Sequence, residues 1–252
     1  MKLNRIIERL NELYPEVLKI DTDNVGLMVG SLNKDVNKVL LALDLTREVM
    51  DEGVKNDVDL IITHHPLIRD PIFSINTDKD PGSIIKDLIK YDIANYAMHT
   101  NFDAVKMNDY LADLIGIKNK EILSVEENIG VYGTIDETRI EDYILKVKKA
   151  FNISSCDYYG KKNVLVKKVG IIGGSGSSLI PHIADKGLDL FITGDVTYSR
   201  GLKAKRLGLN VLDVGHSIEH LYTDVVYEDL KKLDSTLEVI VSTVDVIPYV
   251  RY

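Results

Sequence analysis

Two segments of this chain share the same order of strands, helices and polar residues. The first closes with Asp59-Leu-Ile-Ile-Thr63 and the second with Asp189-Leu-Phe-Ile-Thr193, each after an apolar strand and a helix that ends near a glycine. Strands that alternate with helices at this spacing indicate βαβ units and mainly parallel sheets. The similarity occurs at a single offset of about 130 residues, which favours two related α/β halves over a solenoid of many repeats.

The two halves are expected to span residues 1–127 and 128–252, and they can be intertwined. A turn at residues 125–130 is the best candidate for the boundary, because no Pro- or Gly-rich linker marks one. Open α/β sheets place their functional side chains beyond the carboxyl ends of the strands. We therefore expect the two halves to face each other across a shared cleft.

Two adjacent histidines, His64 and His65, directly follow the first repeated strand. Neighbouring side chains on a strand point to opposite faces, so both can serve one site only if the chain leaves the strand there. Pro66 favours this departure, because proline restricts the residue before it and cannot donate to a ladder. A structural histidine pair that caps a turn is the alternative interpretation.

Two later apolar runs also end in imidazole and carboxylate groups. His99 and Asp103 follow one run, and His216 and Glu219 follow the other. Residues three apart lie on one helix face, although a glutamate near a helix start is also an ordinary preference. These ligand types suit zinc, iron, manganese or nickel better than calcium or magnesium. More than four candidate ligands indicate two divalent metal ions per chain.

Asp103 is the candidate bridging ligand, since a carboxylate can join two metal ions whereas imidazole does not. His99 is open to three roles: metal ligand, positioning partner of Asp103, or proton shuttle. We take the last as the prediction, which makes His99 the candidate catalytic residue.

A glycine-rich turn at residues 173–178 follows the first strand of the second repeated segment and precedes a helix. Backbone N–H groups of Gly174, Ser175 and Gly176, ahead of a helix start, would form an anion site for a phosphate. A tight strand-to-helix turn explains the same residues equally well.

Composition excludes several classes of protein. A formal net charge of −8 and a pI near 5.3 argue against nucleic-acid binding, which usually needs a basic surface. The single cysteine, Cys156, allows no internal disulfide and suits a reducing compartment. No apolar run approaches the length of a membrane span, and the amino terminus predicts an amphipathic helix rather than a signal peptide. We expect a soluble, cytoplasmic protein.

Short phrases along nearly the whole chain carry a resemblance to one protein family. These phrases are Asp23-Asn-Val-Gly-Leu27, Ala42-Leu-Asp-Leu-Thr46, Ile62-Thr-His-His-Pro66, His99-Thr-Asn-Phe-Asp103, Gly173-Gly-Ser-Gly176, Thr193-Gly-Asp195 and Asp213-Val-Gly-His216. With them the chain resembles the NGG-one-interacting-factor-three-like family, often labelled GTP cyclohydrolase I type 2 homologs.

The resemblance implies two α/β halves with a dinuclear metal centre between them. It implies His64, His65, Asp103 and His216 as metal ligands, and a homo-oligomer in the form of a hexameric ring. Larger relatives carry an inserted domain between the halves, for which this chain is too short.

Two positions depart from the family pattern. Thr22 stands where the family usually has tryptophan, a change expected to affect packing rather than metal binding. The family glutamate commonly lies four residues after the last histidine, where this chain has His220. Glu219, one residue earlier, is the ligand we predict, with His220 as its rival.

The function expected from these features is a dinuclear metal-dependent hydrolase for a nucleotide-like or phosphate-bearing substrate. The family label suggests ring opening of GTP. The alternative is a non-catalytic metal-binding ring scaffold or a regulatory interaction protein. Peptidase or phosphodiesterase chemistry would differ from the first only in substrate.

Overall fold

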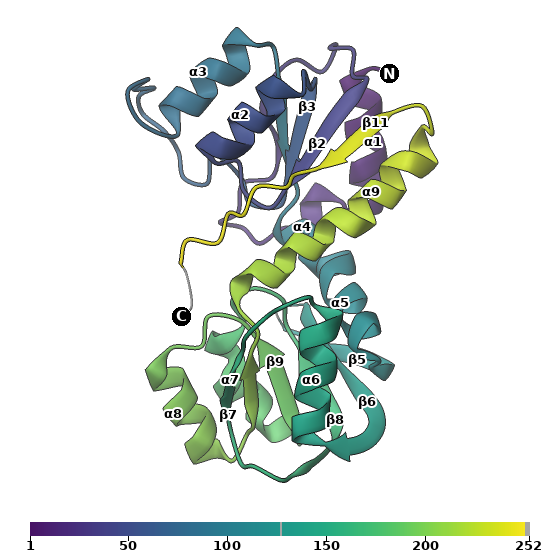
Figure 1. The fold of residues 1–252 in the computed structure, drawn as a ribbon, viewed down its shortest axis with the longest axis vertical. Coiled ribbons are helices and arrows are strands. Elements are labelled where there is room, and N and C mark those ends of the chain that lie inside the picture. The colour runs from purple at the N-terminus through teal and green to yellow at the C-terminus, as the bar shows by residue number, and fades with distance from the viewer. Residues whose placement is uncertain (127, 250–252) are drawn as a thin grey trace. The chain divides into compact units, whose positions relative to one another are not determined.

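The computed structural model describes residues 1–126 and 128–249 of the chain. They form two compact units (Figure 1). Unit 1 consists of Met1–Phe102 together with the described residues from Tyr222 onward, and unit 2 consists of the described residues of Asp103–Leu221.

Unit 1 is built around a five-stranded sheet with the strand order β1-β4-β3-β2-β11. Its elements in chain order are α1 (Leu3–Leu13), η1 (Glu16–Leu18), β1 (Gly26–Val29), β2 (Lys38–Ala42), α2 (Arg47–Lys55), β3 (Leu60–Thr63), α3 (Gly82–Lys90), β4 (Ala94–Ala97), α4 (Thr100–Phe102), α9 (Tyr222–Leu233) and β11 (Glu238–Val241). Only β1 runs antiparallel to its neighbour, so this sheet is mainly parallel, as predicted.

Helices cover the unit 1 sheet, and this explains its apolar strands. All four residues of β3 are buried, as expected for a parallel strand with both faces covered. Helices α2 and α3 pack through Val49, Met50, Ile84 and Leu88 on strand residues that include Leu40 and Ile61, and Figure 1 shows α1 beside α9.

Unit 2 contains a six-stranded sheet with the order β5-β6-β8-β9-β10-β7. Its elements are a π-helix, η2 (Asp103–Met107), α5 (Asn108–Ile115), β5 (Lys118–Ser124), β6 (Ile129–Arg139), α6 (Ile140–Ala150), β7 (Asp157–Tyr159), β8 (Leu165–Ile171), η3 (Ser177–Leu179), α7 (Ile180–Ile183), η4 (Ala184–Lys186), β9 (Leu190–Thr193), α8 (Tyr198–Leu207), β10 (Val211–Asp213) and η5 (His216–Leu221). Strands β8, β9 and β10 are parallel, whereas the outer pairings are antiparallel. The α/β fold class is therefore confirmed, with a second sheet that is parallel only at its centre.

The two units repeat the same contacts at positions about 130 residues apart. Asp59 Oδ2 accepts backbone N–H groups at 2.7 and 3.1 Å before β2 and at its start, and Asp189 Oδ2 accepts two at 2.9 and 2.8 Å in β8. The register also agrees, with Val39 opposite Leu60 in one unit and Val169 opposite Leu190 in the other. The internal duplication is thus visible in side-chain contacts as well as in strand order.

The boundary between the units differs from the expected division at residues 127 and 128. Strand β11 returns to pair with β2, and α9 packs on unit 1, so the end of the chain belongs with its beginning. Strand β5 pairs with β6, which brings residues from 103 onward into unit 2. Residue 127, the expected boundary, lies outside the described residues. Long-range strand pairing, which local sequence does not specify, causes this difference.

None of the helices in residues 1–126 and 128–249 combines the length and the apolar character needed to cross a membrane.

Candidate metal centre

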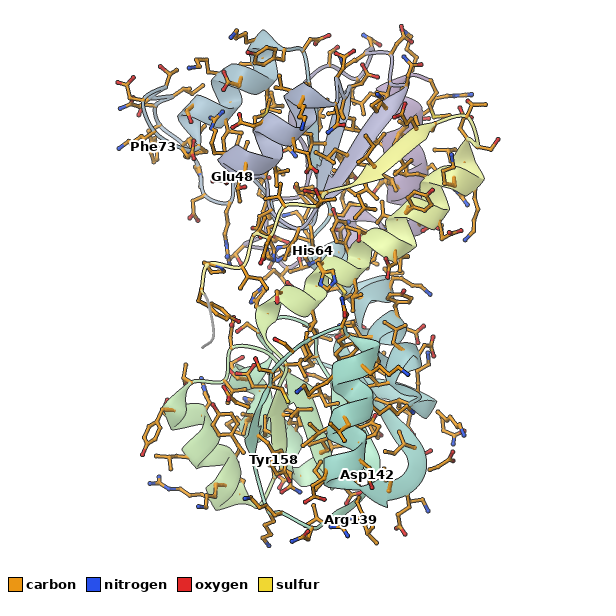
Figure 2. All side chains as sticks on the ribbon, viewed as in Figure 1. Glu48, His64, Phe73, Arg139, Asp142 and Tyr158 are labelled. Carbon is orange, nitrogen blue, oxygen red and sulfur yellow. The ribbon has the colours of Figure 1, made fainter. Side chains whose placement is uncertain are left out.

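Three histidines of unit 1 gather at the carboxyl ends of two neighbouring strands. His64 and His65 follow β3, and His99 follows β4 by two residues. Their ring centroids are 5.1 to 5.4 Å apart, and one ring nitrogen from each lies within 4.8 Å of the others. His64, labelled in Figure 2, is fully buried. The structure thus brings together histidines from two separate sequence motifs.

Aspartates fix two of these three imidazole rings. His65 Nδ1 donates to Asp44 Oδ1 at 2.8 Å, and His99 Nδ1 donates to Asp23 Oδ1 at 2.9 Å. A proton on Nδ1 places the lone pair of the neutral ring on Nε2. This is the arrangement that carboxylates impose on metal-binding histidines.

Asp23 holds His99 through a dense set of hydrogen bonds. Its carboxylate also accepts the backbone N–H of Thr100 at 3.1 Å and the Thr100 hydroxyl at 2.5 Å. Burial opposes ionisation of Asp23, but the hydrogen bonds from His99 and Thr100 outweigh it and lower the pKa of this carboxyl well below its usual range. Asp23 is therefore a fixed negative charge behind His99.

Aromatic side chains hold the ring of His64. Its centroid lies 5.3 Å from that of Tyr222 and 6.1 Å from that of Phe102. The Tyr222 hydroxyl in turn donates to the carbonyl oxygens of Ala42 and Ile62, at 2.8 and 2.9 Å. His64 is thus positioned by aromatic packing, whereas His65 and His99 are positioned by hydrogen bonds to aspartates.

In unit 2, His216 and Glu219 lie side by side on the 3-10 helix η5. His216 Nε2 is 2.9 Å from Glu219 Oε2. Because a 3-10 helix has three residues per turn, side chains at i and i+3 are eclipsed. His220 is displaced from this line, and its Nδ1 donates to the Ser217 carbonyl at 2.7 Å. The 3-10 geometry therefore places Glu219, rather than His220, beside His216.

A third aspartate fixes His216. Asp195 Oδ2 accepts the Nδ1 proton of His216 at 2.7 Å. The hydrogen bond to Glu219 raises the pKa of His216 to about 9, with burial acting against the rise and Asp195 adding to it. Asp195 itself has a backbone φ of 54°, a conformation that non-glycine residues rarely adopt and that concentrates at functional sites.

Asp103 begins the π-helix η2, another feature that is frequent at functional sites. One of its carboxylate oxygens lies within 4.8 Å of a Glu219 carboxylate oxygen. Asn108, the first residue of α5, donates to the backbone carbonyl of Asp103 at 3.3 Å. Unit 2 therefore brings Asp103, His216 and Glu219 together.

The glycine turn (residues 173–176) uses part of its backbone within unit 2. The N–H of Gly173 donates to Asn108 Oδ1, and that of Gly176 donates to Thr193 Oγ1, each at 2.9 Å. The helical segment that follows it consists of three short pieces, η3, α7 and η4, and the dipole of such short helices is small. The anion site at Gly174, Ser175 and Gly176 stays a prediction.

The sequence did not predict the role of four residues that orient the candidate ligands. They are the orienting aspartates Asp23, Asp44 and Asp195, and Asn108. The duplication offers a signal for one of them, because Asp195 occupies the position in the second repeat that His65 occupies in the first. Asp44 follows β2, next to β3 in the sheet, and a prediction of strand order would have identified it.

The fold and the site define a class: a duplicated α/β protein with histidine and carboxylate groups that could hold a metal ion. A family model described as Duf34/NIF3 (NGG1p interacting factor 3) matches residues 1–248. The chain belongs to this family.

Relatives and solved structures agree with the assignment. A GTP cyclohydrolase 1 type 2 homolog of Clostridium perfringens is 40% identical over 252 residues, 96% of each chain. A Lactococcus lactis protein of the same name is 34% identical over 95% of each chain. A Bacillus cereus protein related to NIF3 superposes with a TM-score of 0.93 at 26% identity, covering 100% of this chain and 99% of that one. Reduced HcgD from Methanocaldococcus jannaschii gives 0.86 at 31% identity, covering 97% and 98%.

Proposed function

We propose that this protein is a dinuclear metal-dependent hydrolase that acts on a nucleotide-like or phosphate-bearing substrate. One observation carries the proposal. Aspartates accept the Nδ1 protons of His65, His99 and His216 at 2.7 to 2.9 Å, an arrangement that is common around metal-binding histidines.

The proposed ligands are His64, His65, Asp103, His216 and Glu219, and together they hold two divalent ions. The donor set of nitrogen and carboxylate oxygen fits zinc, iron, manganese or nickel. Bound metal of this kind supplies a water of lowered pKa and polarises the bond to be cleaved.

His99 acts as the proton shuttle in this proposal. Asp23 orients its ring through the 2.9 Å contact to Nδ1, and a fixed ring orientation is what a general acid–base histidine requires. His99 also belongs to the group of three unit 1 histidines that could hold one ion, so its role as a ligand is the rival assignment. Metal content of His99→Ala separates the two, since a shuttle is dispensable for binding.

The substrate class rests on the relatives and on the glycine turn. Relatives from Clostridium perfringens and Lactococcus lactis are named GTP cyclohydrolase 1 type 2 homologs, which makes GTP the first compound to test. The backbone of Gly174 and Ser175 would approach the phosphates. The reducing conditions that the single Cys156 favours suit a cytoplasmic nucleotide enzyme.

Metal content and hydrolysis, measured on the same preparation, test this function. Protein purified without chelator is expected to contain about two transition-metal ions per chain and to hydrolyse GTP or a related phosphate. His65→Ala should lose metal and activity together. His182→Ala is the matched control, because His182 is exposed and outside the site.

Absence of bound metal in the wild-type protein would contradict the proposal at its root. Full metal content with no turnover on a broad phosphate panel would instead favour a second function, a non-catalytic metal-binding ring scaffold. One observation supports that alternative: Gly173 and Gly176 already donate their N–H groups within unit 2, which leaves fewer donors for a phosphate. Light scattering would test the homohexamer that both functions assume.

A further inference from the structure

The carboxylate of Glu219 packs against Gly174, in the space that a side chain at position 174 would fill. A Cβ atom at position 174 would lie 2.0 Å from Glu219 Oε1 and 2.7 Å from its Cδ. Glu219 is only 4% exposed, and the backbone at Gly174 has a φ of 62°. Space and backbone conformation therefore both favour glycine there.

The backbone of the glycine turn is itself held by the next strand. The carbonyl of Gly174 accepts the N–H of Gly194 at 2.8 Å and the Thr193 hydroxyl at 3.3 Å. Gly194 is packed equally tightly, since a Cβ there would lie 2.8 Å from the backbone nitrogen of His216. The backbone of Gly194 thus contacts both the backbone of Gly174, next to Glu219, and the backbone of His216.

Asn108 connects this turn with the segment that carries Asp103. Its Oδ1 accepts the N–H of Gly173 at 2.9 Å, and its Nδ2 donates to the carbonyl of Asp103 at 3.3 Å. Asn108 is itself buried. One side chain therefore links the backbone next to Gly174 with the first residue of the π-helix.

We infer that the glycine turn positions the metal-binding carboxylate of Glu219, with Gly174 as the positioning residue and Asn108 as its link to Asp103. This inference rests on the proposed metal centre and deepens it. The atom closest to a Cβ at 174 is the end of a flexible side chain, so the fold can accept alanine by moving the Glu219 carboxylate. That movement changes the position of the carboxylate relative to His216, whose Nε2 lies 2.9 Å from Glu219 Oε2.

Gly174→Ala, compared with Gly187→Ala, separates this effect from backbone strain. Gly187 has a φ of 66°, close to that of Gly174, but a Cβ there would meet nothing within 4 Å. Both variants carry the same conformational penalty, and only the first displaces Glu219. Zinc is the probe, with affinity measured by chelator competition and with the rise in melting temperature on zinc addition as a second readout.

We expect Gly174→Ala to bind zinc about tenfold to one hundredfold more weakly than wild type, as is usual when the support of a metal ligand is lost. Without zinc, the two variants should melt at similar temperatures. With zinc, Gly187→Ala should gain as much as wild type, and Gly174→Ala should gain less.

Wild-type zinc affinity in a folded Gly174→Ala protein would overturn the inference while leaving the proposed function intact. If that variant does not fold, the zinc affinity of Asn108→Ala tests the inference instead. This substitution removes the hydrogen bond to Gly173 without filling the space beside Glu219. Weaker zinc binding by Asn108→Ala supports the inference, and unchanged binding overturns it. If wild-type protein binds no zinc or other transition metal, the proposed function itself fails.

Discussion

At the scale of single residues, the site consists of imidazole rings whose orientation is set by a second side chain. Asp44, Asp23 and Asp195 each accept one Nδ1 proton, while His64 is held between Tyr222 and Phe102. A charged acceptor selects one tautomer and restricts ring rotation, which lowers the ordering cost when a metal binds.

Replacing Asp195 with asparagine should weaken metal binding about tenfold, because the neutral amide still accepts the Nδ1 proton but contributes no negative charge. Chelator competition with zinc measures the change. The control is Asp185→Asn, since Asp185 is exposed and lies outside the site. Equal affinities for the two variants would show that Asp195 has no part in metal binding.

At the scale of elements, the proposed histidine ligands follow the ends of strands, and hydrogen bonds from two tyrosines connect α9 with the sheet of unit 1 and with α1. Tyr222, the first residue of α9, joins the carbonyls of Ala42 and Ile62 at the ends of β2 and β3. Tyr14, at the end of α1, donates to Asp229 Oδ2 of α9 at 2.5 Å. Both hydroxyls are buried, so each bond costs more to lose than an exposed one.

Tyr222→Phe should lower the free energy of unfolding by about 1–3 kcal/mol, since two buried carbonyls lose their donor. Denaturant titration of the metal-free protein measures this. Tyr198→Phe should leave stability unchanged, because Tyr198 is 80% exposed. A Tyr222→Phe protein as stable as wild type would mean that water replaces the hydroxyl.

Alkaline pH should destabilise the protein partly through Tyr14. Burial, followed by the hydrogen bond and charge of Asp229, raises the pKa of Tyr14 far above its ordinary value. A raised folded-state pKa gives stability that is fully present below the ordinary tyrosine pKa of about 10 and is lost as pH rises further.

The free energy of unfolding should therefore fall above pH of about 10, and less steeply in Tyr14→Phe than in wild type. Parallel denaturant titrations at several pH values, with phenolate absorbance recorded, provide the measurement. Identical slopes in the two proteins would exclude Tyr14 as a contributor.

At the scale of the whole molecule, the chain passes from one unit to the other twice, after Phe102 and after Leu221. Both passages are close in sequence to proposed ligands: Asp103 follows the first directly, and Glu219 lies just before the second. Each unit also has its own buried apolar core. Metal binding is thus expected to influence the segments that join the units.

Adding metal should stabilise the whole chain. At a free metal concentration one hundred times Kd, one site contributes about 2.7 kcal/mol if the unfolded chain does not bind. Calorimetry with and without chelator tests this, and His65→Ala should show no gain. Hydrogen exchange would show whether protection increases around residues 99–107 and 216–222.

The sequence alone determined much of this protein. Apolar runs and their repeated order predicted α/β halves, and the motif residues His64, His65, His99 and His216 were found at strand ends as expected. These features are local, because a strand and the residue that follows it are encoded by neighbouring positions.

Tertiary structure alone decided the rest. It returned β11 to the first sheet, made the outer strands of the second sheet antiparallel, and placed Glu219 rather than His220 beside His216 through a 3-10 turn. It also paired each of three histidines with an aspartate between 21 and 76 positions away in the chain. Such contacts depend on which strands become neighbours, and packing of the complete chain settles that, because no local pattern specifies it.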